Sequence, residues 1–150
     1  MKQEILIREI LKSTNDVIEE VIGIKPVQLE TANYLDDRID YEITVINSIT
    51  GGKKGIFLIR CSRETADKIN AIISKKYSDT ERNPLCSLSN EITSEAKKSI
   101  IDMNLDFSES ALIEGENLQF GFSSSSKVRA IELELEDIGI VSIVIVYKSK

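Results

Sequence analysis

The side chains that usually carry out catalysis are few in this sequence, and their scarcity excludes several reaction classes. The 150 residues include no histidine, which removes the usual general base near neutral pH, the Ser-His-Asp and Cys-His arrangements and every His-ligated zinc site. The only cysteines, Cys61 and Cys86, lie far apart and form no CxxC or other metal-ligand spacing. The seven glycines form neither a GxGxxG nor a GxxxxGKS/T loop, so no nucleotide-phosphate cradle is expected. The remaining chemistry must use amides, hydroxyls and carboxylates, and we expect no metal site.

Side chains of these kinds gather in three stretches. The first carries, at helical spacing, Ser87, Asn90, Glu91 and Ser94. The second is an alternating acidic row, Glu132, Glu134 and Glu136, which is typical of the solvent-facing side of an antiparallel strand rather than of a carboxylate metal site. The third, a serine run over 123–126, has no activating base beside it and is interpreted as a loop. The first stretch is therefore the strongest candidate, although an asparagine on a helix is most often an ordinary solvent-facing residue.

Composition favours one soluble domain. A chain of this length with 41% hydrophobic residues can bury one proper core and is too short for two ordinary domains, so we predict a single domain over residues 1–150. No apolar run approaches the ~20 residues that a membrane span needs, and free cysteines fit a reducing compartment, so we expect a cytoplasmic protein with no membrane association. The net charge of -6, with Lys and Arg interspersed among the acids, disfavours a nucleic-acid surface.

The elements of the first half follow from apolar periodicity and turn residues. Apolar residues recur at mostly helical spacing from Lys2 to Ile22 and stop at Gly23, which predicts an amphipathic helix with an irregularity near 13–15. A short strand over 27–30 and a polar connection at 36–38 come next. Alternation over 41–49, a glycine turn over 51–55 whose glycines supply positive φ, and an apolar run over 56–59 predict a hairpin.

The second half begins with two helices and ends in strands. Ser62 is the predicted cap of a helix that ends near Tyr77, and Asn83 followed by Pro84 is a strong signal for the start of the next helix. That helix has an apolar stripe at steps of three and four: Leu85, Leu88, Ile92, Ala96 and Ile100. Strands are predicted over 107–113, over 118–122 and on both sides of a turn at 137–139. The last strand, over 140–147, is apolar on both faces and should lie centrally.

Both halves share one order of elements: a long helix, a short strand, a connection, and a hairpin that ends in an apolar strand. This order predicts an α+β fold in which pseudo-duplicated units of a helix plus three strands form an antiparallel sheet with the long helices packed on one face.

Four stretches together resemble the CheX proteins, relatives of the CheC and FliY phosphatases that remove phosphate from the chemotaxis response regulator CheY. They are residues 14–26, 51–66, 90–97, and 108–115 with the final hairpin. The similarity runs nearly end to end, and the order and spacing of the stretches carry it. The resemblance implies a CheC-like fold.

The functional helix of that family typically reads Asp or Ser, three residues, Glu, two residues, Asn, three residues, and then Gly-Asn-Ala-Lys. Aligned on the Ala-Lys pair at 96–97, Asn90 falls on the family's asparagine. Ser87 stands at the glutamate position, Ser94 at the glycine position and Asn83 at the initial acidic position. The family's double proline, which follows a serine after this helix, is replaced at 109–110 by Glu-Ser.

The resemblance implies a phosphatase of phosphorylated CheY-like receiver domains. In that chemistry the receiver supplies Mg²⁺, the phosphorylated aspartate and a lysine, so the phosphatase needs no cofactor of its own and only positions the attacking water. A primary amide offers both a donor and an acceptor for this purpose, and Asn90 would be that group. The residues expected to contact the receiver are Ser87, Asn83, Glu91 and Ser94.

Ser87 leaves a second interpretation open. The family's glutamate is thought to hold the receiver's lysine, and Ser87 keeps the position but lacks the charge. The alternative is therefore a catalytically degenerate CheX-like module that binds or scaffolds a signalling partner through the same helix. CheX proteins form homodimers through their sheets, and long apolar strands leave an edge that must be covered, so we also expect a homodimer.

Overall fold

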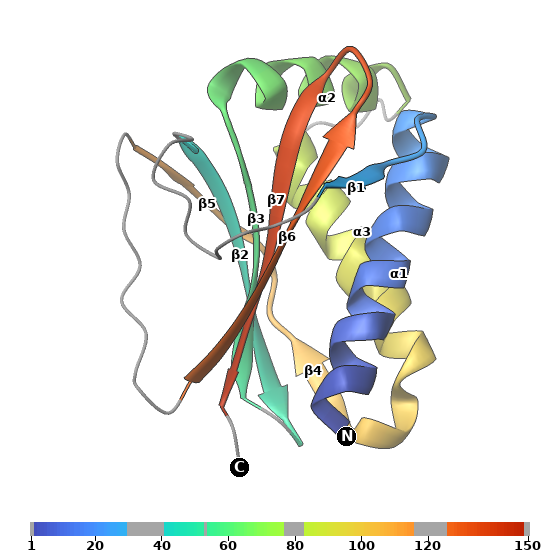
Figure 1. Ribbon diagram of the computed structural model, residues 1–150, viewed down its shortest axis with the longest axis vertical. Helices are drawn as coiled ribbons and strands as arrows, with labels where there is room; N and C mark the ends of the chain where they lie inside the picture. Colours follow the sequence, from blue (N-terminus) through green and yellow to red (C-terminus); the bar gives the residue numbers. More distant parts are fainter. Residues whose placement is uncertain (1, 30–40, 53, 77–82, 116–125, 149–150) are drawn as a thin grey trace.

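Two long helices lie against one face of an antiparallel sheet, and a third helix crosses its end (Figure 1). The computed structural model describes residues 2–29, 41–52, 54–76, 83–115 and 126–148. The elements in chain order are α1 (Lys2–Ile22), β1 (Val27–Leu29), β2 (Ile43–Gly51), β3 (Gly55–Cys61), α2 (Arg63–Lys76), α3 (Pro84–Ser99), the 3₁₀ turn η1 (Ile101–Met103), β4 (Leu105–Phe107), β5 (Ala111–Glu114), β6 (Ser126–Leu135) and β7 (Gly139–Lys148). These bounds confirm the predicted helices and both hairpins.

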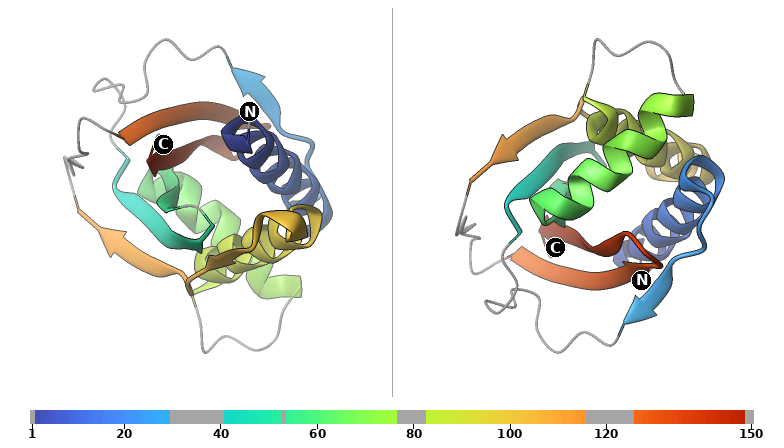
Figure 2. Two further views of the ribbon diagram at one scale, coloured as in Figure 1. Left: turned by 90° about the horizontal axis from the view of Figure 1, so that it is seen from below. Right: turned by 90° about the horizontal axis from the view of Figure 1, so that it is seen from above.

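The order of strands in the sheet confirms the predicted duplication. The strands run β1-β6-β7-β3-β2-β4, and β5 also pairs with β2. The two apolar strands β3 and β7 adjoin at the centre, each flanked by its hairpin partner. The short strand of each half pairs with the hairpin of the other half, since β1 lies on β6 and β4 lies on β2. The units α1-β1-β2-β3 and α3-β4-β6-β7 are thus equivalent, and Figure 2 shows α1 and α3 side by side on the same side of the sheet.

The main core lies between the sheet and the helix pair. Alternate residues of the four central strands point to this side, as the pleat requires, and they are buried together with the inner stripes of α1 and α3. On β7 these are Val141, Ile143, Ile145 and Tyr147. The intervening β7 residues Val144 and Val146 are buried on the opposite face, which explains why this strand is apolar on both sides and confirms its central position.

The opposite face of the sheet carries a row of polar side chains in neighbouring strands. Thr44, Arg60, Ser142 and Glu132 occupy adjacent register positions across β2, β3, β7 and β6, and Arg60 is only 7% exposed. The Tyr41 ring lies 5.2 Å from the Arg60 guanidinium carbon, and its hydroxyl donates to Glu132 Oε2 at 2.7 Å. The expectation that Glu132 belongs to a solvent-facing acidic row is therefore wrong, because it is half-buried and accepts this bond.

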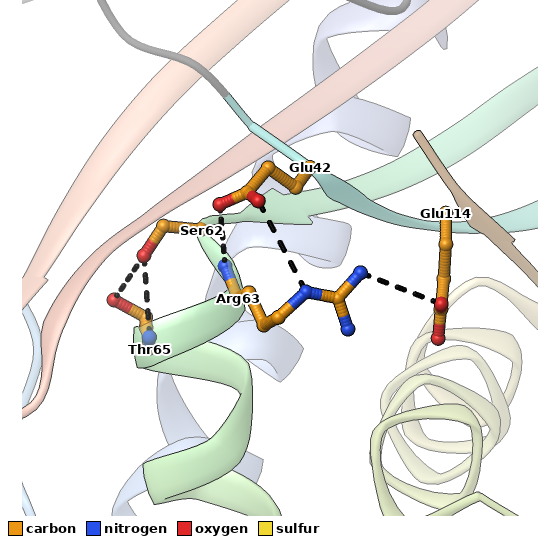
Figure 3. Close-up of polar contacts among 5 residues, drawn as sticks. All are labelled: Glu42, Ser62, Arg63, Thr65 and Glu114. Atoms are coloured by element: carbon orange, nitrogen blue, oxygen red, sulfur yellow. Dashed lines mark hydrogen bonds and ion pairs between the residues drawn. The ribbon is translucent and has the colours of Figure 1, made fainter. Parts of the chain in front are cut away.

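The start of α2 is fastened to β2 and β5 (Figure 3). Ser62 Oγ accepts from the Thr65 backbone N–H at 3.2 Å, which confirms the predicted N-cap. Arg63 pairs with Glu42 and, at 3.5 Å, with Glu114, so one exposed guanidinium connects the helix to two strands. Ion pairs this exposed contribute little stability, at most about 1 kcal/mol each.

Three local predictions are corrected by the structure. Helix α1 runs without a break through 13–15. Within it Thr14 is buried, and its hydroxyl donates to the Ile10 carbonyl at 2.7 Å. In the glycine turn only Gly51 has positive φ, whereas a Cβ at Gly52 or Gly55 would overlap a backbone carbonyl of a neighbouring segment. The single strand predicted over 107–113 is two strands, β4 and β5. The connection at 36–38, the strand over 118–122 and most of the serine run lie outside the described residues.

A bulge separates β4 from β5. Ile49 pairs with Phe107 in β4 and Ile46 pairs with Ala111 in β5, so three residues, 108–110, oppose two residues of β2. At this point the Ser48 N–H donates to the Ser108 hydroxyl at 2.7 Å rather than to a backbone carbonyl. The side chain thus interrupts the ladder and re-aims the chain, as bulges next to functional sites often do.

Candidate functional site

The candidate helix α3 starts as the sequence predicts. Asn83 Oδ1 accepts from the Leu85 N–H at 2.9 Å, and Pro84 stands in the first turn. The predicted apolar stripe is buried along its whole length. The side chains of this stripe fix the rotation of α3, and that rotation decides which polar residues face outward.

Asn90 lies at a shallow hollow of about 310 Å³ between α3 and the bulge. The hollow is lined by Asn90, Thr93, Ser94 and Lys97 of α3 and by Phe107, Ser108 and Glu109. Of the residues predicted to contact a partner, Ser94 is exposed and shares this hollow with Asn90. Ser87, Asn83 and Glu91 are half-buried and are not part of its lining.

The Asn90 side chain is tied to the bulge by its carbonyl oxygen. Asn90 Oδ1 accepts from the Ser110 backbone N–H at 3.1 Å and from the Ser110 hydroxyl at 2.7 Å. It also accepts from Asn47 Nδ2 of β2 at 3.3 Å. Asn90 is therefore not an ordinary solvent-facing residue, since it is half-buried and three donor groups converge on its Oδ1.

The amide nitrogen of Asn90 is in a different situation. No hydrogen bond among the described residues uses Asn90 Nδ2, and this atom is not one of their buried atoms that lack a partner. Nδ2 is therefore accessible to water, and it carries two N–H donors. The amide can donate to a ligand or a water, while its acceptor is already used within the protein.

Asn47 lies under α3 and is fully buried, with 0% exposure. Its Nδ2 donates to the Ser108 carbonyl at 2.9 Å as well as to Asn90. Its Oδ1 accepts from the hydroxyl of Ser89, which is also fully buried, at 2.5 Å. The Ser110 hydroxyl lies 3.1 Å from the same oxygen and can donate to it in place of Asn90 Oδ1. Asn47, Ser89, Asn90 and Ser110 thus form one connected group, which we name the amide network.

The charges around the hollow are mixed. Lys97 pairs with Asp106 of β4 at 2.5 Å across its rim, and both side chains are largely exposed. The acid in its lining is Glu109 of the bulge. Among the described residues, no group of three or more cysteine or acidic side chains is arranged to hold a metal ion.

The two cysteines, Cys61 and Cys86, are buried free thiols. Burial, reinforced by the charge of Asp67, raises the pKa of the Cys61 thiol to about 12, so it stays protonated at neutral pH.

Sequence analysis identified Asn90 but missed Asn47 and Ser110. A signal for Asn47 was present, because residues 43, 45, 47 and 49 share one side of β2 and three of them are apolar. A polar side chain in that inward row indicates a buried hydrogen-bonding partner. Ser110 gave no comparable signal, because its role depends on a bulge whose position is set by pairing between distant segments.

The fold is that of known chemotaxis proteins. No family model matches the sequence, and neither does any curated protein. Among solved structures, CheX from Desulfovibrio desulfuricans superposes with a TM-score of 0.76 at 16% identity, over 95% of this chain and 99% of that one. CheX of the CheX–CheY–BeF3–Mg complex from Borrelia burgdorferi gives 0.77 at 17% identity, over 95% and 97%. A CheC-like superfamily protein from Shewanella sp. PV-4 gives 0.76 at 17%, over 97% and 98%.

The chain therefore has the CheC-like fold, in agreement with the fold implied by its sequence. None of the described helices is long and apolar enough to cross a membrane.

Proposed function

We propose that this chain is a chemotaxis protein of the CheX type that binds a phosphorylated CheY-like receiver domain through α3 and promotes loss of its phosphoryl group. The observation that carries the proposal is the accessible amide nitrogen of Asn90 beside a surface hollow, on a fold shared with a CheX solved together with CheY. The receiver brings the phosphorylated aspartate and its Mg²⁺, so α3 has to supply only a group that orients water.

Hydrolysis requires a water in line with the bond that breaks. An N–H of Asn90 Nδ2 donates to the water oxygen and leaves a lone pair of that oxygen free to attack phosphorus. The bond between phosphorus and the aspartyl oxygen then breaks, the aspartate leaves as a carboxylate, and a proton of the water passes to a phosphoryl oxygen. Holding the water in this geometry lowers the entropic part of the barrier, and an amide does this without titrating. The reaction therefore needs no histidine.

The other side chains of the hollow would contact the receiver. Ser94 is small and exposed on the turn after Asn90, so it allows a partner to approach closely. Lys97 and Glu109 place one charge of each sign on opposite walls, and both can pair with charged side chains of the receiver surface. Ser87, on the preceding turn of α3, would meet the receiver at the edge of the contact.

The test is phosphate release from a phosphorylated cognate receiver with and without the protein. Asn90→Asp is the informative variant, because aspartate keeps the acceptor that Ser110 and Asn47 use and removes the N–H donors. We expect the rate of phosphate release with this variant to fall at least a hundredfold, toward the receiver's own rate of dephosphorylation. Ser99→Ala is the control, since this exposed hydroxyl bonds only to its own helix backbone and lies outside the hollow.

Binding of the receiver is measured in parallel, for instance by fluorescence anisotropy. A wild-type protein that binds the phosphorylated receiver without accelerating phosphate release at any concentration would contradict catalysis and leave the function of a binding module. An Asn90→Asp variant as active as wild type would remove Asn90 from the mechanism.

We also propose that the chain associates as a homodimer. The proposal is supported by the edge of β6, where, among the residues that the structure describes, β1 pairs with Glu132–Glu134 alone. Light scattering that gives 16.8 kDa at micromolar concentration would contradict it.

A further inference from the structure

The amide network is unusual because it places a fully polar side chain where the fold supplies an apolar environment. Asn47 lies in the inward row of β2 between Val45 and Ile49, and all three are at most 1% exposed. Burying an amide costs free energy unless its hydrogen bonds are satisfied. Asn47 has a partner for each polar atom, since its two N–H groups donate to Ser108 and Asn90 while Oδ1 accepts from the Ser89 hydroxyl.

The orientation of each amide in the network is fixed by a backbone group. The Ser110 N–H can only donate, so the Asn90 atom that faces it at 3.1 Å must be the acceptor Oδ1. The Ser108 carbonyl can only accept, so the Asn47 atom that faces it at 2.9 Å must be the donor Nδ2. Flipping the Asn90 amide would place a donor against the Ser110 N–H, and flipping the Asn47 amide would place an acceptor against the Ser108 carbonyl.

The same contacts restrain rotation of Asn90. Turning its amide by 180° would bring Nδ2 against the Ser110 N–H and Asn47 Nδ2, and all three groups are donors. The Ser110 hydroxyl adds the shortest bond to Oδ1, at 2.7 Å. One orientation remains, with the acceptor toward the bulge and the donors outward.

We propose that Asn47 and Ser110 are positioning residues that hold the Asn90 amide with its N–H donors directed into the hollow. The catalytic consequence rests on the function proposed above, because a donor oriented in advance spares the entropy of ordering it when the receiver docks. The structural part, a locked Asn90 amide, stands independently of any enzymatic activity. Neither residue touches the water or the phosphoryl group; both act through Asn90.

The bulge at 108–110 places Ser110 within hydrogen-bonding distance of α3. Its extra residue moves Ser110 off the regular β ladder, so that its N–H donates to Asn90 of α3 and its hydroxyl lies between Asn90 and Asn47. A regular strand would present its N–H within the sheet plane, directed at β2. The one-residue insertion is thus the feature that brings the sheet edge to the helix at the height of Asn90.

The test compares Asn47→Leu and Ser110→Ala with Val45→Ala. Val45 is equally buried on the same face of β2, two residues from Asn47, and takes no part in the network, so its truncation controls for a weakened strand. Ser110→Ala removes only the hydroxyl of a half-buried residue and keeps the proposal testable if Asn47→Leu does not fold.

The first readout is the Asn90 side-chain amide in ¹⁵N-labelled protein, assigned by its absence in Asn90→Asp. We expect a distinct pair of signals in wild type and in Val45→Ala and a shift of that pair toward solvent-exposed values in Asn47→Leu. Ser110→Ala should give a smaller shift in the same direction, because it loses the hydroxyl but keeps the backbone N–H that donates to Asn90. An Asn90 amide that behaves identically in all four proteins would overturn the proposal.

The second readout is phosphate release. We expect kcat to fall about tenfold in both network variants while KM for the phosphorylated receiver stays near the wild-type value. If the wild type is active, and the network variants free the Asn90 amide without any change in kcat, the positioning role is overturned. A wild type with no activity would refute the proposed function alone, since the amide spectrum decides the locked orientation by itself.

Discussion

Replacing Asn90 by alanine should destabilise the fold measurably. The change removes the acceptor for three donor groups. The Ser110 hydroxyl can turn to Asn47 Oδ1 or to the Cys86 carbonyl at 3.3 Å. The Ser110 N–H and the Asn47 N–H that donates to Asn90 both lose their acceptor, while the second Asn47 N–H keeps the Ser108 carbonyl. An unsatisfied buried N–H costs about 1–3 kcal/mol, and the two together about 2–4 kcal/mol because the Asn47 bond is a long one. Alanine regains about 0.5 kcal/mol of helix propensity, so the net loss should be about 1.5–3.5 kcal/mol.

Urea unfolding followed by far-UV circular dichroism measures this difference. Asn90→Asp is the matched variant, because it keeps an oxygen at the position of Oδ1, and we expect it to lose less than half of what Asn90→Ala loses. Ser94→Ala, on the exposed turn beyond, should stay within about 0.5 kcal/mol of wild type. An Asn90→Ala protein as stable as wild type, with an unchanged m value, would refute the role assigned to the network. A loss equal in both Asn90 variants would show that the acceptor is not what matters.

Three further changes test other parts of the structure. The Cβ of Gly55→Ala would overlap the Val146 carbonyl in the centre of the sheet, so this variant should lose about 1–3 kcal/mol of unfolding free energy. Gly23→Ala has open space around its Cβ and should lose only about 1 kcal/mol, from left-handed backbone strain. Equal losses in the two variants would contradict this assignment. The pKa of Cys61 is raised from 9.0 to about 12, so the unfolded chain releases this proton first, and the free energy of unfolding should decline as pH rises above 9. Urea titrations at pH 8 to 10.5 should show a smaller decline in Cys61→Ala, and equal slopes would contradict the origin in this thiol. Ser87→Glu restores a charge one turn before Asn90 and should raise phosphate release about ten to a hundredfold. A rate that stays at the wild-type value would contradict a receiver cation at this position.

The sequence was sufficient for the elements and for the face that each buries. The start of helix α3 was predicted to the residue because Asn83 and Pro84 specify it, and the stripe from Leu85 to Ile100 specifies its inner side. The helix was expected to continue to 103 but ends at Ser99, where the 3₁₀ turn η1 follows. Alternating apolar residues predicted the long hairpins. The strand that is apolar on both faces, β7, predicted the centre of the sheet. These signals are local, so one stretch of chain contains all of the information.

The candidate site was predicted only in part, because its partners are distant in sequence. Periodicity places Asn90 beside the buried stripe but does not show what its side chain meets. Its partners come from an inward position of β2 and from the bulge at 108–110, and that bulge depends on a one-residue difference in register between β4 and β5. A polar residue in an apolar row, as at Asn47, was the one visible sign. Ser87, Asn83 and Glu91 were expected to contact the receiver because of their places along the helix, and the hollow lies on the Ser94 side of Asn90.

The exchange of short strands between the two halves has a consequence for how the chain folds. Because β1 pairs with β6 and β4 pairs with β2, neither half can complete its own sheet. As the chain leaves the ribosome, β1 has no partner until synthesis has reached β6. Pairings between residues so far apart raise the contact order, and the entropy of closing such loops slows the search for the native state. We therefore expect one cooperative folding transition that is slow for a domain of this size, with no independently folded half along the way.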